Sequence, residues 1–148
     1  NRLIDDFSRG WRDWYRLNWK NPHHWIYATR KIVDPVWIGP KQGELGLEIE
    51  TFGDGNELGV QINVNDWQGY TGRKRDTFVA LVHLPKTGLH RLSLPASQFR
   101  NLAGEVMKDW DEMTELLFSP ANRTEDPRAS KSNWNGKPPR LVKLQWLL

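Results

Sequence analysis

Short runs of alternating hydrophobic and polar residues recur along the chain. The clearest are residues 45–51 and 58–64, which the turn sequence Gly53-Asp54-Gly55-Asn56 separates. A period of two places every second side chain on the same face of a β-strand. A glycine-rich and asparagine-rich turn between two such runs is typical of a hairpin. We therefore expect residues 45–64 to form a β-hairpin with one face in a hydrophobic core.

The same pattern predicts strands over residues 3–7, 25–32, 77–84, 89–94 and 142–148. The turn Pro85-Lys86-Thr87-Gly88 predicts a second hairpin between residues 77–84 and 89–94. Helical periodicity is weak, and only residues 97–102 and 110–116 are candidates for a single helical turn. Residues 120–139 are polar and rich in proline and serine, which predicts loop structure. The fold class is therefore all-β.

The chain has 148 residues, of which 38% are hydrophobic and 26% are charged, so we expect one globular domain over residues 1–148. It contains no cysteine, which excludes disulfides and thiolate metal sites. No apolar run approaches the roughly 20 residues of a membrane-spanning helix. The chain begins at Asn1 without a signal-peptide pattern, so we interpret it as a processed piece of a longer protein.

Nine tryptophans are far more than the core of one small domain requires. An exposed indole offers a flat apolar ring that can stack on the C–H face of a sugar. Amide, carboxylate and guanidinium groups beside such a ring can bind the sugar hydroxyls. The surplus of tryptophan therefore favours carbohydrate binding.

Two segments carry a family resemblance: residues 92–99, Leu-Ser-Leu-Pro-Ala-Ser-Gln-Phe, and residues 109–118, Asp-Trp-Asp-Glu-Met-Thr-Glu-Leu-Leu-Phe. They resemble the galactose-binding-like jelly rolls that serve as carbohydrate-binding modules of glycoside hydrolases. The opening residues 3–7 and the closing residues 141–148 are similar to the first and last strands of that family. The resemblance implies a jelly-roll β-sandwich of two antiparallel sheets, with Trp110 and Phe99 in its core. It also implies a secreted protein, extracellular or periplasmic, tethered to a catalytic domain such as an agarase, with polysaccharide as partner.

Two geometries are open for the carbohydrate site. In the first, Gln61 and Asn63 lie on the polar face of their strand and bind along a glycan chain. In the second, the site is a loop rim built from aromatic residues. The candidates for the rim are Trp67 and Tyr70 in a glycine-containing polar loop and Trp134 between two asparagines. Trp37 is a further candidate, although its place between two prolines favours a core ring that plugs the end of the sandwich. Arg75, in the run Arg73-Lys74-Arg75, would give the site a positive margin suited to an anionic polysaccharide; the alternative, which such a charge run favours, is a solvated loop.

The sequence also permits a catalytic domain, a structural calcium site and an interaction module. The first is a catalytic polysaccharide lyase or hydrolase domain on the same sandwich. Paired carboxylates such as Glu48 and Glu50 are what glycoside hydrolysis requires, but these two alternate with core residues as an exposed face does. Jelly rolls of the resembling family often hold a structural calcium, for which Asp5, Asp6 and Asp54 are the candidate ligands. The net charge of +3 also permits a nucleic-acid or protein-interaction module.

Overall fold

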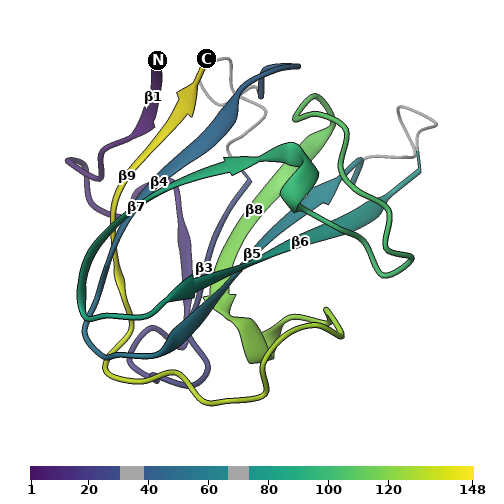
Figure 1. Ribbon diagram of the computed structural model, residues 1–148. Coiled ribbons are helices and arrows are strands. Elements are labelled where there is room, and N and C mark those ends of the chain that lie inside the picture. The colour runs from purple at the N-terminus through teal and green to yellow at the C-terminus, as the bar shows by residue number, and fades with distance from the viewer. Residues whose placement is uncertain (31–38, 67–73) are drawn as a thin grey trace.

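Two antiparallel sheets stacked face to face make up the molecule (Figure 1). The computed structural model describes residues 1–30, 39–66 and 74–148. The four-stranded sheet has the order β1 (Arg2–Asp5), β9 (Arg140–Leu147), β4 (Glu44–Thr51) and β7 (Gly88–Pro95). The five-stranded sheet has the order β2 (Tyr15–Leu17), β3 (Ile26–Thr29), β8 (Met113–Pro120), β5 (Asn56–Val64) and β6 (Asp76–Leu84). The expectation of an all-β sandwich is confirmed.

Both predicted hairpins are wrong, although their strands are correct. β4 pairs with β7 and β9, whereas β5 pairs with β6 and β8, so the turn between β4 and β5 crosses from one sheet to the other. The turn between β6 and β7 crosses in the same way. The two crossing turns are fastened together: the Gly55 N–H donates to the Pro85 carbonyl, and Asp54 Oδ1 accepts from the N–H and hydroxyl of Thr87.

Residues 113–120 form strand β8, so the helical turn considered for residues 110–116 is also wrong. Their side chains alternate between the core and the outside, because Leu116 and Phe118 face inward while Leu117 lies on the outer face. The other helical candidate is close to the short 3-10 turn η3 (Ala96–Gln98). A second such turn, η4 (Ala121–Arg123), follows β8 directly.

Aromatic rings pack against one another in the core between the two sheets. Trp110 lies 5.4 Å from Phe99 and 5.2 Å from Trp146, measured between ring centroids, and its indole N–H donates to the Gly43 carbonyl. Trp14 stacks on Phe118 at 5.9 Å. The prediction that Trp110 and Phe99 are core residues is confirmed, since both are 1% exposed or less, and Trp146 is buried with them.

Gly59 of β5 makes room for η4 on the outer face of the five-stranded sheet. A Cβ atom at this position would lie 2.5 Å from the Thr124 methyl and 3.4 Å from the Ala121 Cα. Thr124 cannot move away easily, because it is buried and its hydroxyl donates to the Ala121 carbonyl. The missing side chain of Gly59 therefore lets the segment from η4 to Thr124 lie against the sheet.

We expect Gly59→Ala to lower the free energy of unfolding by about 1–3 kcal/mol, because the added methyl overpacks this contact. Gly46→Ala is the matched control in the other sheet, where the new Cβ would meet only side-chain atoms of Gln145 and Leu147 at 3.1–3.2 Å. That variant should change stability by less than about 1 kcal/mol. Urea unfolding of both variants is the measurement, and equal losses would contradict the role given to Gly59.

Candidate functional site

A row of polar side chains crosses the outer face of the five-stranded sheet. Asn63 of β5 lies opposite Glu115 of β8 on one side and opposite Thr77 of β6 on the other. Arg30 directly follows β3 and reaches Glu115 from the far side. Because neighbours in register project from the same face, Arg30, Glu115, Asn63 and Thr77 form one line across four strands.

Hydrogen bonds join this row into one network. Arg30 Nε donates to Glu115 Oε2 at 2.8 Å, and Asn63 Nδ2 donates to Glu115 Oε1 at 2.6 Å. Asn63 Oδ1 in turn accepts from the Thr77 hydroxyl at 2.9 Å and from Gln61 Nε2 at 3.2 Å. Both Glu115 and Asn63 are less than 10% exposed. The network therefore fixes the orientation of the Asn63 and Gln61 amides.

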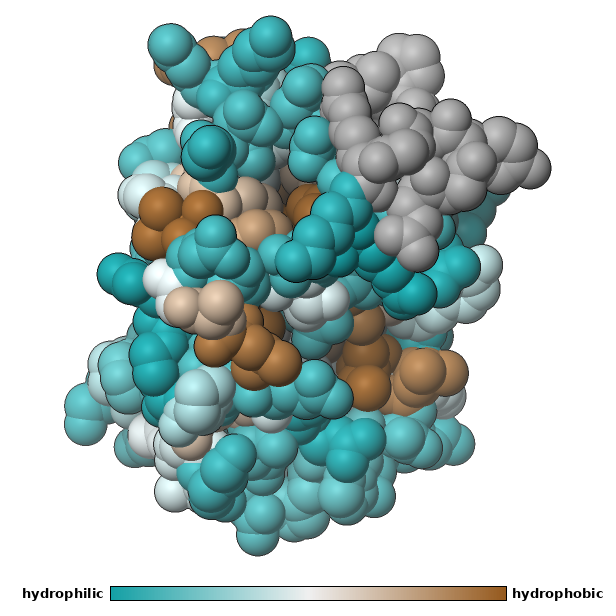
Figure 2. All heavy atoms as spheres, turned by 90° about the vertical axis from the view of Figure 1, so that its right-hand side faces the viewer, coloured by the Kyte–Doolittle hydropathy of each residue, from teal (hydrophilic) through white to brown (hydrophobic). Residues whose placement is uncertain are grey.

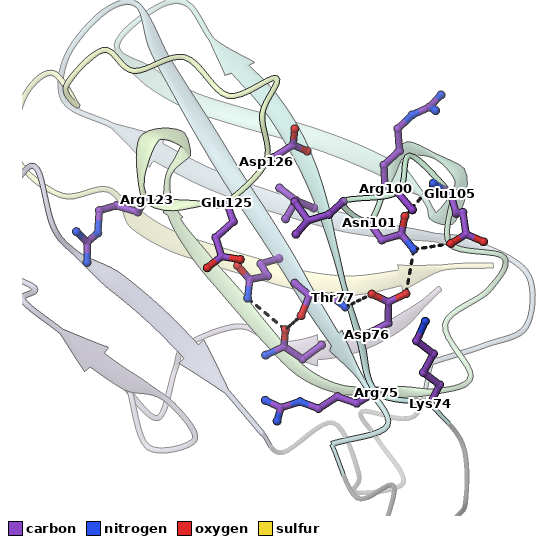
Figure 3. A pocket seen from close by; sticks show the side chains of 15 residues that line it. Lys74, Arg75, Asp76, Thr77, Arg100, Asn101, Glu105, Arg123, Glu125 and Asp126 are labelled. Carbon is purple, nitrogen blue, oxygen red and sulfur yellow. Dashed lines mark hydrogen bonds between the residues drawn. The ribbon is translucent and has the colours of Figure 1, made fainter.

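Two loops turn this part of the sheet into a groove of about 660 Å³. Gln61, Asn63, Thr77 and Val79 lie among its lining residues. Figure 3 shows residues of the 100–105 loop on one side and residues 123–126 on the other. Figure 2 faces the side of the molecule on which β5 and β6 lie in Figure 1; its surface is mostly hydrophilic, with small separate hydrophobic patches.

The wall formed by the 100–105 loop is tied to β6. Val79 and Arg100 exchange both backbone hydrogen bonds, at 2.8 and 3.0 Å. The Asn101 amide nitrogen donates to Asp76 Oδ2 at 2.9 Å and to Glu105 Oε1 at 3.0 Å (Figure 3). This wall is thus attached at its base and cross-linked by one side chain.

The opposite wall is held by an ion pair between Asp126 and Arg128. Arg128 donates to both carboxylate oxygens of Asp126, through Nη2 at 2.6 Å and Nε at 3.0 Å. Its Nη2 also donates to the Val79 carbonyl, which attaches this segment to β6. The hydrogen bond from the Arg128 side chain lowers the pKa of Asp126 below its ordinary value.

The groove carries balanced charge. Its described lining includes four cationic residues, Lys74, Arg75, Arg100 and Arg123, and four acidic residues, Asp76, Glu105, Glu125 and Asp126. Arg75 also pairs with Asp66, with Nε and Oδ1 3.0 Å apart. The described lining therefore does not present the positive margin expected from the sequence.

The structure brings together three of the predicted site residues, because Gln61, Asn63 and Arg75 all line the groove. Trp134 is not exposed as expected: its side chain is 3% exposed and packs edge-on against Trp25, with ring centroids 5.1 Å apart. Its flanking asparagine Asn135 is engaged in hydrogen bonds with Asn56 and Asp54, which folds this segment onto the end of the sandwich. Trp37, Trp67 and Tyr70 lie outside the described residues.

Most of the tryptophans in the described residues lie in the core. Five of the tryptophans in the described ranges are buried: Trp14, Trp25, Trp110, Trp134 and Trp146. Trp11 is partly buried, and the Arg16 guanidinium lies between its ring and the ring of Trp19, at 4.6 and 4.8 Å. Trp19 is 45% exposed.

Each aspartate considered as a calcium ligand accepts hydrogen bonds from within the protein. Asp5 accepts hydrogen bonds from the Phe7 N–H and from the Trp14 indole, and Asp6 accepts from the Ser8 N–H. Asp54 lies in the β4–β5 turn, where it holds Thr87. In residues 1–30, 39–66 and 74–148, no three acidic, histidine or cysteine side chains come together as metal ligands would.

The sequence pattern does not single out Arg30 or Glu115. Glu115 lies in a segment whose sequence also permits a helical turn, which obscures its place on a strand face. Arg30 lies in a predicted strand, and nothing near it in the sequence indicates that it pairs with Glu115.

No protein-family model, curated protein or solved structure matches this chain.

We expect Asn63→Ala to lower the free energy of unfolding by about 1–3 kcal/mol, because it removes the donor to the buried Glu115 Oε1. Thr77→Val should cost less than about 1 kcal/mol, since Gln61 still donates to Asn63 Oδ1. Chemical denaturation of the two variants tests the order. A Thr77→Val loss as large as that of Asn63→Ala would contradict the central position of Asn63.

Because the pKa of Asp126 is lowered, we expect this carboxyl to affect how the free energy of unfolding changes at low pH. A carboxyl whose folded pKa lies below its unfolded pKa contributes stability above the unfolded pKa, and that contribution is lost as the pH falls through the folded pKa. Unfolding free energies measured from about pH 5 downward should therefore fall less steeply for Asp126→Asn than for the parent protein. Arg128→Met removes the other end of the pair and should flatten the curve similarly. An unchanged slope in Asp126→Asn would exclude this pair as a source of acid sensitivity.

Proposed function

We propose that this chain is a non-catalytic carbohydrate-binding module, and that it binds glycan in the groove on the outer face of the five-stranded sheet. The observation that carries the proposal is the hydrogen-bonded row from Arg30 to Thr77, which presents oriented amide groups on the floor of an open groove. The alternative loop-rim geometry loses Trp134, since that ring is buried.

The chemistry of the groove suits sugar hydroxyls. Each hydroxyl both donates and accepts, and amides and carboxylates offer both kinds of partner at fixed positions. Groups already held by neighbours lose little conformational entropy when a ligand binds. The Gln61 amide is held by Asn63, and Asn101 is held between Asp76 and Glu105. A polar ligand with hydroxyls along its edge would meet groups that need little rearrangement.

The balanced charge favours a neutral glycan over an anionic one. Equal numbers of cationic and acidic residues give the described lining no net charge that would attract sulfate or uronate groups. The same balance argues against a nucleic-acid partner, which requires a basic surface. A neutral galactan such as agarose remains the specific proposal, supported by the family resemblance alone.

The mechanism we propose is targeting. A module that holds a tethered enzyme on insoluble polymer raises the local concentration of that enzyme, even when each module binds weakly. The proposal includes secretion to the cell exterior or periplasm and a catalytic domain elsewhere in the parent protein. In the described part of the chain, no helix has the length and apolar character needed to cross a membrane.

A catalytic role has weaker support. Glu48 and Glu50, the paired carboxylates considered from the sequence, lie on the outer face of the four-stranded sheet, where each contacts an arginine. Glu48 Oε1 is 2.9 Å from Arg91 Nε, and Glu50 Oε1 is 2.9 Å from Arg140 Nε. These contacts are those of an exposed structural face. Release of reducing ends from any glycan by the isolated chain would reverse this assignment.

Affinity electrophoresis in gels containing neutral polysaccharides tests the proposal directly. The parent chain should be retarded, and Gln61→Ala should bind about three- to tenfold more weakly, as expected for the loss of one or two hydrogen bonds. Glu48→Gln, on the opposite sheet, is the control and should bind like the parent. Binding should change little with added salt. A steep salt dependence would indicate a nucleic-acid or other polyanion partner instead.

A further inference from the structure

A second line of residues crosses the outer face beside the polar row. Strand registers place Tyr15 opposite Ala28, Ala28 opposite Leu117, Leu117 opposite Gln61, and Gln61 opposite Val79. This line, which we term the transverse track, therefore includes one residue from each of the five strands. It begins at edge strand β2 and ends in the groove, where Gln61 and Val79 are lining residues.

Between its two ends the transverse track carries two apolar residues. Ala28 has only a methyl group and is buried, and Leu117 is half-buried. Tyr15, at the β2 end, is 61% exposed. An exposed phenol ring that continues a line of apolar residues is a surface on which the C–H face of a sugar can stack.

A second hollow lies at the β2 end. Its volume is about 290 Å³, and Tyr15, Arg30 and Asp13 are among its lining residues. Arg30 links this hollow to the groove, because it bonds Glu115, whose other oxygen accepts from Asn63. The two hollows thus lie at the two ends of the same five-strand face and share one hydrogen-bond network.

We propose that the ligand is an extended, unbranched glycan that follows the transverse track across the strands, with Tyr15 as a remote stacking residue. This inference rests on the proposed function of the groove. Four strand spacings of about 4.8 Å separate β2 from β6, so the transverse track is about 19 Å long. A mono- or disaccharide cannot contact both ends, whereas a longer oligosaccharide can.

The test is calorimetric titration with two length series, agaro-oligosaccharides and cello-oligosaccharides, each from disaccharide to octasaccharide. In the series that binds, affinity should rise with length until the transverse track is filled. Tyr15→Ala should weaken binding of the hexasaccharide and octasaccharide by about tenfold and leave the disaccharide unaffected. Tyr15→Phe keeps the ring and should bind like the parent. Leu89→Ala, which truncates an exposed residue of the four-stranded sheet, is the surface control.

The outcomes separate this inference from the function on which it rests. If short and long oligosaccharides bind equally and Tyr15→Ala binds like the parent, the transverse track is overturned while carbohydrate binding stands. If the parent binds no member of either series and no neutral polysaccharide in the gel assay, both proposals fail. Because Tyr15 is exposed, thermal unfolding of Tyr15→Ala should match that of the parent, so weaker binding would not reflect misfolding.

Discussion

Glu115 is the side chain on which the arrangement of the outer face depends. Its carboxylate is almost fully buried within the five-stranded sheet, and each of its oxygens has a partner from a neighbouring strand. A buried charge is tolerated only when hydrogen bonds and an opposite charge compensate for lost hydration. Arg30 and Asn63 provide that compensation, and Asn63 then orders Thr77 and Gln61. One carboxylate thereby orders side chains on β5 and β6 and the arginine that follows β3.

The sequence was sufficient to predict most strands but not how they pair. A period of two depends only on which side chains face a core, and β4 and β5 face the same core from opposite sheets. A hairpin and a crossing between sheets therefore produce the same pattern, and the turn residues 53–56 are compatible with both. The decisive contacts, such as that between Gly55 and Pro85, join segments that are far apart in the chain. The local pattern of hydrophobic and polar residues cannot predict such long-range contacts.

The candidate site was predictable in part for the same reason. Gln61 and Asn63 could be recognised because amides replaced the usual Lys and Glu on a strand face. Glu115 and Arg30 could not, because their importance arises only from pairing between β3, β8 and β5. Trp134 shows the opposite error: its polar neighbours favour exposure, yet Asn135 bonds to Asp54 and Asn56 and the ring packs inward. In the described residues, five tryptophans are buried in the core, so the proposal for the groove is argued from its oriented polar groups.

The crossing of β4–β5 and β6–β7 between the sheets also bears on how the domain assembles. Strands adjacent in sequence cannot pair with each other in these two places, so neither segment can form a stable local unit before distant strands arrive. Topologies dominated by such non-local pairing fold slowly, because the entropy of closing long loops is lost before the contacts that compensate for it form. Both sheets should thus acquire their structure in one cooperative transition, and a fragment holding only one of them would lack the opposing layer that its apolar face requires.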